Sequence, residues 1–486
     1  MPATHSASSP RTIVAAVGAA LLTACAAGPD YVRPSVEVPA TYKEAAGWKS
    51  AEPKPVESQQ SWWESYGDPT LNALMQDAER ANQNLRVAEA QYREARALAD
   101  AARAGLFPSV GASGGAQRAR TNTNGVKLGN TVDVALNASW EPDLWGSVRR
   151  SIESGEAGAQ ASADDLAAAR LSIQAALAQD YFQLRVTDQQ RELYASTTAA
   201  YARALQLTQA QHRAGVVLLS DVALAESQLT TAQAQAVDLD AQRSQLEHAI
   251  AILTGRPPAA FSLAAATAAQ PFDARVPASP PGLPSQLLER RPDIAAAERR
   301  VALANANIGV ARAAYFPSLV LSAGGGFSAA GLGSLLDTPS RVWSLGAVLA
   351  QTVFDGGLRR AHDAQAVAAY DAAVAAYKQT VLSGFQQVED NLATLGVLDQ
   401  ESELQAQAVK ASQLAERLAL SQYRAGTATY LSVITAQTLS LSNQRTAVQL
   451  RGRQLVASVS LITATGGGWT PAVPVATNPT TSQPKT

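Results

Sequence analysis

The chain is poor in the residues that most often build catalytic or metal centres. Its 486 residues include one cysteine and four histidines, and its formal net charge is −2. A single cysteine excludes a disulfide within the chain and a metal site built on cysteines. A net charge near zero provides no global field that would attract nucleic acid. We therefore expect no metal, no cofactor and no nucleic-acid partner.

Aromatic residues and membrane-length apolar runs are also scarce. Aromatic side chains make up 6% of the chain although 47% of its residues are hydrophobic. With alanine so abundant, this composition favours long, closely packed helices over a bulky globular core. The apolar run from Ile13 to Leu22 is too short to span a bilayer as a helix, and it is typical of a secretory signal.

The start of the chain explains the lone cysteine. The apolar run leads through small residues to Cys25, a pattern that resembles the bacterial lipoprotein signal. Cys25 would then be the lipidated first residue of the mature chain, anchored by acyl chains such as palmitate. An ordinary signal peptide with an incidental cysteine is the alternative. Ala26 stands where an aspartate would favour inner-membrane retention in such lipoproteins, so we expect the outer membrane.

A motif at 102–115 occurs again at 311–324. Both copies carry Ala-Arg-Ala, a Phe-Pro-Ser step, a serine and a glycine at the same spacing. Because proline cannot continue a helix and favours extended geometry before it, each copy predicts a helix that becomes a strand. Further matches follow in order, among them the Arg-Ala-Gly turns at 213–215 and 424–426. The chain is therefore expected to be a duplication of one large unit rather than a solenoid.

Hydrophobic periodicity predicts the same elements in both units. A helix with coiled-coil-like spacing leads to the proline step, a strand hairpin follows, and two long helices complete the unit. In the first unit the elements cover 71–106, 110–120, 131–141, 148–214 and 220–253. In the second they cover 287–314, 319–327, 343–349, 358–425 and 429–464. A helix of some sixty residues is roughly 90 Å long, which no compact globular domain needs.

The strand-like runs have the alternation of membrane barrel strands. Val132, Val134 and Leu136 share one face of the second run, and Asp133 and Asn137 share the other. An apolar face toward lipid and a polar face toward a lumen would explain this pattern, and a half-buried hairpin of a soluble sheet is the alternative. Four strands cannot close, and the smallest common barrels need about eight. One chain would therefore have to share a barrel with one or two further copies.

These patterns divide the chain into six parts. They are a signal peptide at 1–24, a lipid-anchored extended segment at 25–68, a first repeat at 69–258 with its hairpin at about 107–143, a Pro-rich surface linker at 259–284, a second repeat at 285–468 with its hairpin at about 316–354, and a disordered tail at 469–486. Trp62, Trp63 and Tyr66 are expected to dock the extended segment. Asp68 and Pro69 are expected to begin the first helix.

Taken together, these features resemble the outer-membrane efflux proteins. The resemblance rests on the duplicated unit, the run from Cys25 to Pro34, the Arg-Arg-Pro-Asp step at 290–293 and the two Arg-Ala-Gly turns. These are the TolC-like channels, and the lipoprotein branch typified by OprM and NodT is the most similar. The resemblance implies a mostly α fold with membrane β structure, in which a homotrimer forms a twelve-stranded β-barrel continued by a long twelve-helix α-barrel.

The resemblance also implies a function and partners. The protein would be a channel of the cell outer membrane that extends into the periplasm. It would be the passive exit duct of a tripartite efflux system, through which an inner-membrane pump, usually of the RND type, expels small molecules. A periplasmic adaptor, or membrane fusion protein, would join the two. The alternatives are the outer-membrane duct of a type I protein secretion system and a periplasmic coiled-coil scaffold lipoprotein.

Two residues of this chain match the family's gate. Asp221 and Tyr423 correspond to positions that hold the closed periplasmic tip by hydrogen bonds. Asp221 can equally be read as a carboxylate stabilised by the N-terminus of a helix. Ser432 and Thr435 stand where relatives carry constricting aspartates, and Ala428 stands where some carry a gate-bonding arginine. The ring of negative charge would then be missing.

The same turns are candidate contacts for the adaptor. By resemblance, Arg213 and Gly215 in the first turn and Arg424 and Gly426 in the second would meet it. The alternative is that both turns are only helix C-caps, in which glycine takes the left-handed conformation.

We expect no enzymatic activity. The run from Gly111 to Gly115 matches the Gly-x-Ser-x-Gly nucleophile motif, which requires a buried strand before it and a helix after it. Here a helix and a proline step precede the motif, and more strand follows. The histidines of the mature chain lie on amphipathic helices without an acidic partner at a telling spacing.

A soluble scaffold would leave Trp140 and Trp343 without lipid to face.

Overall fold

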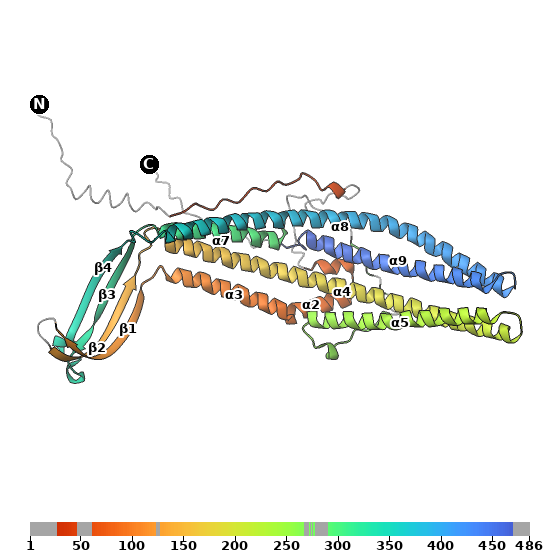
Figure 1. The fold of residues 1–486 in the computed structure, drawn as a ribbon, viewed down its shortest axis with the longest axis horizontal. Coiled ribbons are helices and arrows are strands. Elements are labelled where there is room, and N and C mark those ends of the chain that lie inside the picture. The colour runs from red at the N-terminus through yellow and green to blue at the C-terminus, as the bar shows by residue number, and fades with distance from the viewer. Residues whose placement is uncertain are drawn as a thin grey trace, which may run out of the picture. The chain divides into compact units, whose positions relative to one another are not determined.

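A computed structural model describes residues 27–45, 61–122, 127–266, 272, 274, 276–277 and 290–469. Its elements, labelled in Figure 1, are in chain order η1 Lys43–Ala45, η2 Trp62–Tyr66, α2 Pro69–Ala81, α3 Gln83–Ala104, β1 Ser109–Thr121, β2 Lys127–Trp140, α4 Ser147–Arg213, α5 Leu219–Leu253, η3 Pro258–Ala260, α7 Pro292–Ala313, β3 Ser318–Ala329, η4 Leu332–Ser334, η5 Thr338–Ser340, β4 Arg341–Ala350, α8 Leu358–Arg424 and α9 Tyr430–Ala464. The expected signal peptide, Cys25, much of the linker and nearly all of the tail lie outside the described residues.

The fold is mostly helical with one small sheet, as the sequence predicts. The long helices α4 and α8 each have 67 residues, and α5 and α9 each have 35. Equal lengths in the two halves are what a duplicated unit produces. None of the helices in the described part of the chain combines the length and the hydropathy needed to cross a bilayer.

Packing divides the chain differently from the sequence repeat. One compact unit, here called the sheet unit, comprises Met1–Ser35, Gln91–Ala163 and Ala296–Lys378. The other, here called the turn unit, comprises Val36–Ala90, Asp164–Ala295 and Gln379–Thr486. Each takes residues from both repeats. The repeat is therefore a unit of sequence, whereas each packed unit draws on both copies.

The sheet unit contains a four-stranded antiparallel sheet in the order β1-β2-β3-β4. Its two hairpins lie in the stretches where the sequence predicts them, and β2 joins them by pairing with β3, so that Asn137 lies opposite Gly324. Phe107 and Phe316 stand just before β1 and β3, where proline ends the preceding helix. The order leaves β1 and β4 as edge strands within the chain (Figure 1).

Large apolar side chains of this sheet face away from any core of the chain. All ten residues of β4 are exposed, and Trp343 is 78% exposed. Val134 and Leu136 of β2 are exposed as well. A soluble sheet would cover one face with a core, because exposed apolar area lacks the stabilisation that burial gives. The sheet is therefore incomplete as it stands in one chain.

The core of the turn unit is built around the aromatic residues that the sequence predicts as a docking point. Trp62, Trp63 and Tyr66 are buried against Tyr181 and Phe182 of α4. The indole of Trp62 donates to Gln174 at 3.1 Å, and the hydroxyl groups of Tyr66 and Ser458 lie 2.7 Å apart. These bonds join the segment before α2 to helices of both repeats.

The first helix begins as predicted. The Asp68 carboxylate accepts from the backbone N–H groups of Thr70 and Leu71, and Pro69 is the first helical residue. Tyr181 donates to the second oxygen of the same carboxylate at 2.7 Å. Asp68 thus caps the helix and ties it to α4.

The prediction of one continuous helix over 71–106 is wrong. Asn82 adopts extended geometry, with φ −64° and ψ 125°, and separates α2 from α3. Its side-chain oxygen accepts from Leu85 N–H at 3.1 Å, and its amide donates to Leu253 O at 2.8 Å. Asn82 therefore caps α3 and fastens the break to the end of α5. Periodicity did not reveal the break, because apolar positions on both sides keep the same spacing.

The second repeat has the same break with different chemistry. The predicted helix over 287–314 is interrupted at Arg291, and α7 begins at Pro292. The buried Arg291 guanidinium donates to Ala464 O at 3.0 Å, to Gln387 at 2.8 Å and to both oxygens of Asp293. Arg291 thus fastens this break to the end of α9, as Asn82 does to α5.

Part of the linker packs rather than lying free on the surface. Phe261, Leu263, Phe272 and Val276 pack against the core of the turn unit. Beside them Asp188, whose side chain is fully buried, accepts from Arg243 at 2.8 Å, from Arg185 at 3.2 Å and from Ala266 N–H at 3.1 Å. The expectation of a purely surface connection is corrected for these residues, because apolar contacts and buried charge hold them.

Candidate functional site

The candidate site lies in the turn unit, where α4 turns into α5 and α8 turns into α9. Each turn contains a glycine in the left-handed region, Gly215 at φ 72° and Gly426 at φ 76°. Val216 N–H donates to Gln211 O, and Thr427 N–H donates to Gln422 O, both at 2.9 Å. This bond from the residue after the glycine back to the last helical turn is that of a Schellman cap. Both turns are therefore helix C-caps.

The four predicted adaptor contacts are all exposed. Arg213 and Arg424 are the last residues of α4 and α8, and Gly215 and Gly426 follow them by two positions. The cap thus leaves these residues on the surface of each turn. Contact with an adaptor stays a prediction.

The first turn carries an apolar surface that the sequence reasoning missed. Val216 is 69% exposed, Leu218 73% and Leu219 66%. In the second turn the residues after glycine are Thr427, Ala428 and Thr429, and the apolar surface is smaller. A run of apolar residues directly after a turn glycine was the available signal, but periodicity assigns such residues to a helix face.

Tyr423 links the two helical hairpins. Its ring lies in a buried cluster with Ala225, Tyr430 and Val433, and its centroid is 5.3 Å from that of Tyr430. Its hydroxyl donates to the side-chain oxygen of Gln211, near the end of α4. The predicted gate residue therefore forms a hydrogen bond between helices. Its partner, 212 positions away in the chain, could not be found from spacing alone.

Asp221 lies in the first turn of α5 and is half-buried. This position agrees with the reading of a carboxylate at a helix N-terminus. Burial is the main cause that raises the pKa of the Tyr430 hydroxyl, and the charge of nearby Asp221 also favours the rise. Tyr423 and Asp221 thus belong to one neighbourhood, but the hydroxyl of Tyr423 is bonded to Gln211 instead of the aspartate.

Tyr430 is a further member of this site that the sequence did not suggest. Burial raises the pKa of its hydroxyl from 10.0 to about 12, and a hydrogen bond with Thr208 opposes the rise. Thr208 is on α4 and Tyr430 begins α9, so this contact is a second link between the hairpins. The two tyrosines together hold α4 against α8 and α9.

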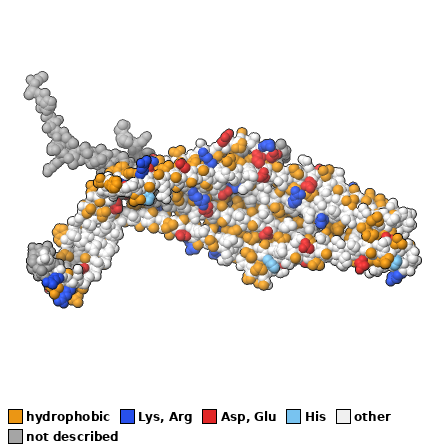
Figure 2. Space-filling view, viewed as in Figure 1, with side chains coloured by type: hydrophobic (Ala, Val, Ile, Leu, Met, Phe, Trp, Pro, Cys, Tyr) orange, Lys and Arg blue, Asp and Glu red, His pale blue; other side chains and the backbone are white. Residues whose placement is uncertain are grey.

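The start of α9 is polar but uncharged. Ser432 and Thr435 are exposed, the hydroxyl groups of Ser432 and Thr429 lie 3.1 Å apart, and Thr435 donates to Leu431 O. Figure 2 shows charged side chains of both signs scattered over the visible face, without a broad patch of one sign. Neither pattern favours recognition of a highly charged partner.

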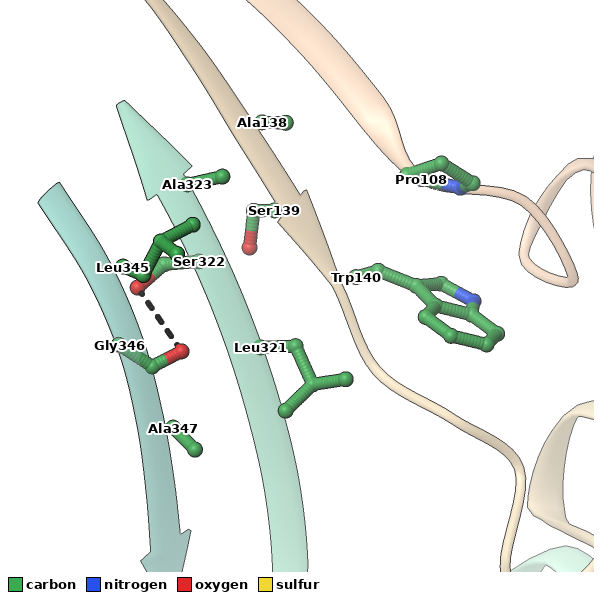
Figure 3. Close-up of a pocket in the computed structure, with 10 residues that line it drawn as sticks. All are labelled: Pro108, Ala138, Ser139, Trp140, Leu321, Ser322, Ala323, Leu345, Gly346 and Ala347. Atoms are coloured by element: carbon green, nitrogen blue, oxygen red, sulfur yellow. Dashed lines mark hydrogen bonds between the residues drawn. The ribbon is translucent and has the colours of Figure 1, made fainter. Parts of the chain in front are cut away.

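A cavity of the sheet unit is lined mainly by apolar and small residues. It has a volume of about 500 Å³ and is lined by residues of the sheet and by Pro108. Figure 3 shows Trp140, Leu321 and Leu345 among its lining residues, with Ser322 donating to Gly346 O as its one drawn hydrogen bond. No titratable side chain is among the ten residues drawn. The site can accommodate apolar groups.

The nucleophile-like motif lies inside a strand. Gly111 to Gly115 are all within β1, so the serine is not at a strand-to-helix turn. In the described residues no group of three or more His, Cys, Asp or Glu side chains could hold a metal ion. Long paired helices, an incomplete apolar sheet and capped helical turns are typical of a membrane-associated transport protein.

Comparison with known proteins gives the family. A family model described as "Outer membrane efflux protein" matches residues 74–256 and again 283–467. The chain belongs to this family of outer-membrane efflux channels. It is the outer-membrane component of an efflux system. The first match lies within the first sequence repeat, and the second match begins two residues before the second repeat and ends within it.

Individual relatives agree with this assignment. The chain is 32% identical over 461 residues to the pyoverdine export outer membrane protein OpmQ of Pseudomonas aeruginosa, covering 92% of this chain and 95% of the relative. It is 31% identical over 469 residues to the toluene efflux pump outer membrane protein TtgC of Pseudomonas putida, covering 93% and 95%. The solved outer-membrane channel OprN superposes with a TM-score of 0.85 at 32% identity, covering 92% of this chain and all of the other.

Proposed function

We propose that three copies of this chain form one closed channel through the outer membrane. The open sheet supports this most directly, because β1 and β4 are unpaired edges within the chain and the sheet exposes apolar side chains. In hydrocarbon each unpaired backbone group costs several kcal/mol, so strands that face lipid must close. Four strands from each of three copies form a twelve-stranded barrel, wide enough to begin to leave a lumen.

The helices of the three copies continue the barrel as a twelve-helix tube on the periplasmic side. Each copy supplies two helical hairpins, α4 with α5 and α8 with α9. Leu404, Leu418 and Leu439 are exposed on these helices in the single chain. Packing against a neighbouring copy buries such side chains, and this burial favours the assembly.

The channel is the passive exit duct of a tripartite efflux system. The named relatives support this, since they are described as export or efflux pump outer membrane proteins. An inner-membrane pump, of the RND type, supplies the energy, and a periplasmic adaptor joins it to the duct. Relatives of similar identity are named for pyoverdine and for toluene, so we assign the choice of exported small molecule to the pump.

Cys25 anchors the chain to the outer-membrane lipid by acylation. Each buried CH₂ of an acyl chain contributes about 0.8 kcal/mol, so several chains on one cysteine anchor it firmly. The sequence around Cys25 supports this proposal. A periplasmic scaffold without membrane contact would leave Trp343 exposed to water.

The adaptor binds at the two turns. Arg213, Gly215, Arg424 and Gly426 are exposed there, and the apolar residues Val216 and Leu218 add surface that a partner would bury. Exposed apolar patches of this kind mark protein interaction sites more often than isolated exposed residues do.

Tyr423 and Asp221 act as a gate at the turns. The hydrogen bond from Tyr423 to Gln211 ties α8 to α4, and opening the duct requires these helices to separate. The double variant Asp221→Ala with Tyr423→Phe removes this bond and the carboxylate. We expect its single-channel conductance in planar bilayers to rise above that of the wild type.

Tyr194→Phe is the matched control for the gate variant. Tyr194 is a buried tyrosine of α4 in a different cluster, so its variant should conduct as the wild type does. Equal conductance of the gate variant and this control would contradict a gate at Tyr423 and Asp221. A purified wild type that forms no channel in the bilayer would contradict the proposed duct itself.

A further inference from the structure

The first described residues of the chain contact the sheet unit through two glycines. Gly28, at φ 90°, lies against Gly309 of α7, where a Cβ on Gly28 would overlap the backbone of Gly309. A Cβ on Gly309 would lie 2.7 Å from Ala27 O and 2.7 Å from the Cγ atom of Arg150. Both positions therefore need glycine, because a side chain at either would push the backbones apart.

A buried arginine holds the same residues. Arg150 of α4 is 6% exposed, and it donates from Nε to Ala27 O at 3.2 Å. It also donates to Gly28 O at 3.4 Å and to the Asp30 carboxylate at 2.8 Å, while Glu153 occupies its remaining nitrogen at 2.7 Å. A guanidinium that binds backbone and carboxylate together is a specific recognition element.

The contact extends along α7. The amide of the buried Asn305 donates to Pro29 O at 2.9 Å, and the hydroxyl of Tyr31 donates to Glu298 at 3.0 Å. Arg33 lies 3.5 Å from the same carboxylate. Residues 27–33 are thus held at successive positions by side chains that face them from two helices.

The segment also reaches the junctions between strands and helices. Ala27 N–H donates to Trp145 O at 3.0 Å. The Trp145 indole in turn donates to Pro317 O at 2.6 Å and stacks on Phe316, with ring centroids 4.7 Å apart. Trp145 follows β2 and Phe316 precedes β3, so this pair ties the two junctions together.

The positions equivalent by the duplication do not reproduce this arrangement. Arg360, the counterpart of Arg150, is exposed, and the position 209 residues before Gly309 is Asp100. Arg360 therefore provides no buried guanidinium, and Asp100 does not allow the close approach of two backbones that Gly309 allows. The site therefore combines residues of both repeats, and it does not follow from the duplication because the equivalent positions do not recreate it.

We propose that Trp145, Arg150, Asn305 and Gly309 form a docking site for the chain's own N-terminal segment, and that occupying it stabilises the two strand junctions. Cys25 precedes Ala27 by two residues, which span about 7 Å of extended chain. The site therefore limits how far Cys25 can lie from the β2 and β3 junctions that Ala27 and Trp145 contact. Only the identity of the anchor rests on the proposed function, since the docking stands on the contacts of residues 27–33.

The test separates the segment from the body after folding. A specific protease site is inserted between Ser35 and Val36 of the full chain, and the purified protein is cleaved in detergent with excess empty micelles. The peptide that ends at residue 35 should remain with the body in gel filtration. Arg150→Ala and Gly309→Ala should each lower the retained fraction about tenfold or more, because charge-assisted hydrogen bonds or the close crossing are lost.

Hydrogen exchange then measures whether the docked segment stabilises the two strand junctions. In the uncleaved variants, peptides covering 141–150 and 312–320 should exchange about tenfold faster than in the wild type, while peptides of α5 stay unchanged. Arg360→Ala is the matched control and should behave as the wild type in both experiments. If either variant fails to fold, it is replaced by Arg150→Lys or Asn305→Ala. Arg150→Lys keeps the volume of the site closer to native, and Asn305→Ala leaves the crossing of Gly28 and Gly309 intact.

The possible results distinguish the docking proposal from the proposal that Cys25 carries a lipid anchor. Loss of the wild-type peptide on cleavage, or equal retention in Arg150→Ala, would overturn the docking site. Normal exchange at both junctions in a variant that has lost its peptide would overturn the stabilising role. The mass of the retained peptide reports acylation of Cys25, and an unmodified mass would overturn the lipid anchor while leaving the docking intact.

Discussion

At the residue scale, glycines with positive φ end all four long helices, but their surroundings differ. A Cβ on Gly255 would overlap Ala81 O, and a Cβ on Gly466 would overlap Arg290 O. Gly215 also has positive φ, but a Cβ there would meet nothing within 4 Å. The left-handed conformation alone costs a non-glycine residue roughly 1–2 kcal/mol.

We therefore predict that alanine is tolerated unequally at these glycines. Gly215→Ala should lower the free energy of unfolding by about 1 kcal/mol, from backbone strain alone. Gly255→Ala and Gly466→Ala should each lower it by about 3 kcal/mol or more, since the overlap with a carbonyl is added. Denaturant titration measures these differences, and similar losses at all three sites would contradict the role of the close approach.

Tyr430 predicts a sensitivity to alkaline pH. The folded-state pKa of Tyr430, about 12, lies above the ordinary 10.0. The contribution of the neutral Tyr430 hydroxyl to the free energy of unfolding is therefore complete below pH 10 and is lost as the pH rises toward 12. Between pH 9 and pH 11 the Tyr430→Phe variant should lose about 1 kcal/mol less stability than the wild type. Urea titrations at the two pH values measure this, and identical losses would show that Tyr430 ionises freely in the folded protein.

The sequence revealed the hydrogen-bond partners of single residues only where those partners are close in the chain. Asp68 was predictable as a cap because it accepts from residues two and three positions later. Gln211 was not, because it meets Tyr423 from 212 positions away. The use of Asn82 at the first helix break and of Arg291 at the second was not predictable either. Each side chain binds a backbone carbonyl at the far end of its repeat.

At the element scale, the linker contact depends on one buried carboxylate. Asp188 binds two arginines and Ala266 N–H, and those arginines also donate to Ala264 O and Leu263 O. Removing one partner of a buried ion network typically costs 3–5 kcal/mol, because charge is left buried and unpaired. Asp188→Ala should therefore destabilise the turn unit by about that amount.

Asp399 provides the control for this prediction. It lies 211 positions after Asp188, is exposed and accepts one bond from Gln454. Asp399→Ala should change the free energy of unfolding by no more than about 0.5 kcal/mol. If both aspartates prove equally tolerant in denaturant titrations, the buried network does not hold the linker.

Whole elements were predictable where one period dominates. The ends of α4, α5, α8 and α9 agree closely with the predicted ranges, because glycine turns and proline steps mark them. The break at Asn82 was hidden, since asparagine fits a helical period and its bonds are tertiary. The apolar surface after Gly215 was hidden for a related reason, because exposure depends on what covers a residue.

At the scale of the whole molecule, the duplication was evident from the sequence, and the way it packs was not. The matches at a nearly constant offset identify two copies, yet both packed units combine residues from each copy. Contacts between copies join residues far apart in the chain, and no local pattern records them. The docking site for residues 27–33, which joins Arg150 of the first repeat to Gly309 of the second, was likewise visible only once these two residues were placed together.

The central claim is that one chain supplies a third of a channel. Its most direct test is the native mass of the wild-type protein extracted from outer membranes in mild detergent. The account predicts a particle of three chains, each close to the 50.6 kDa of the full sequence less its signal peptide. A single chain that keeps its four-stranded sheet folded in water without detergent would contradict it.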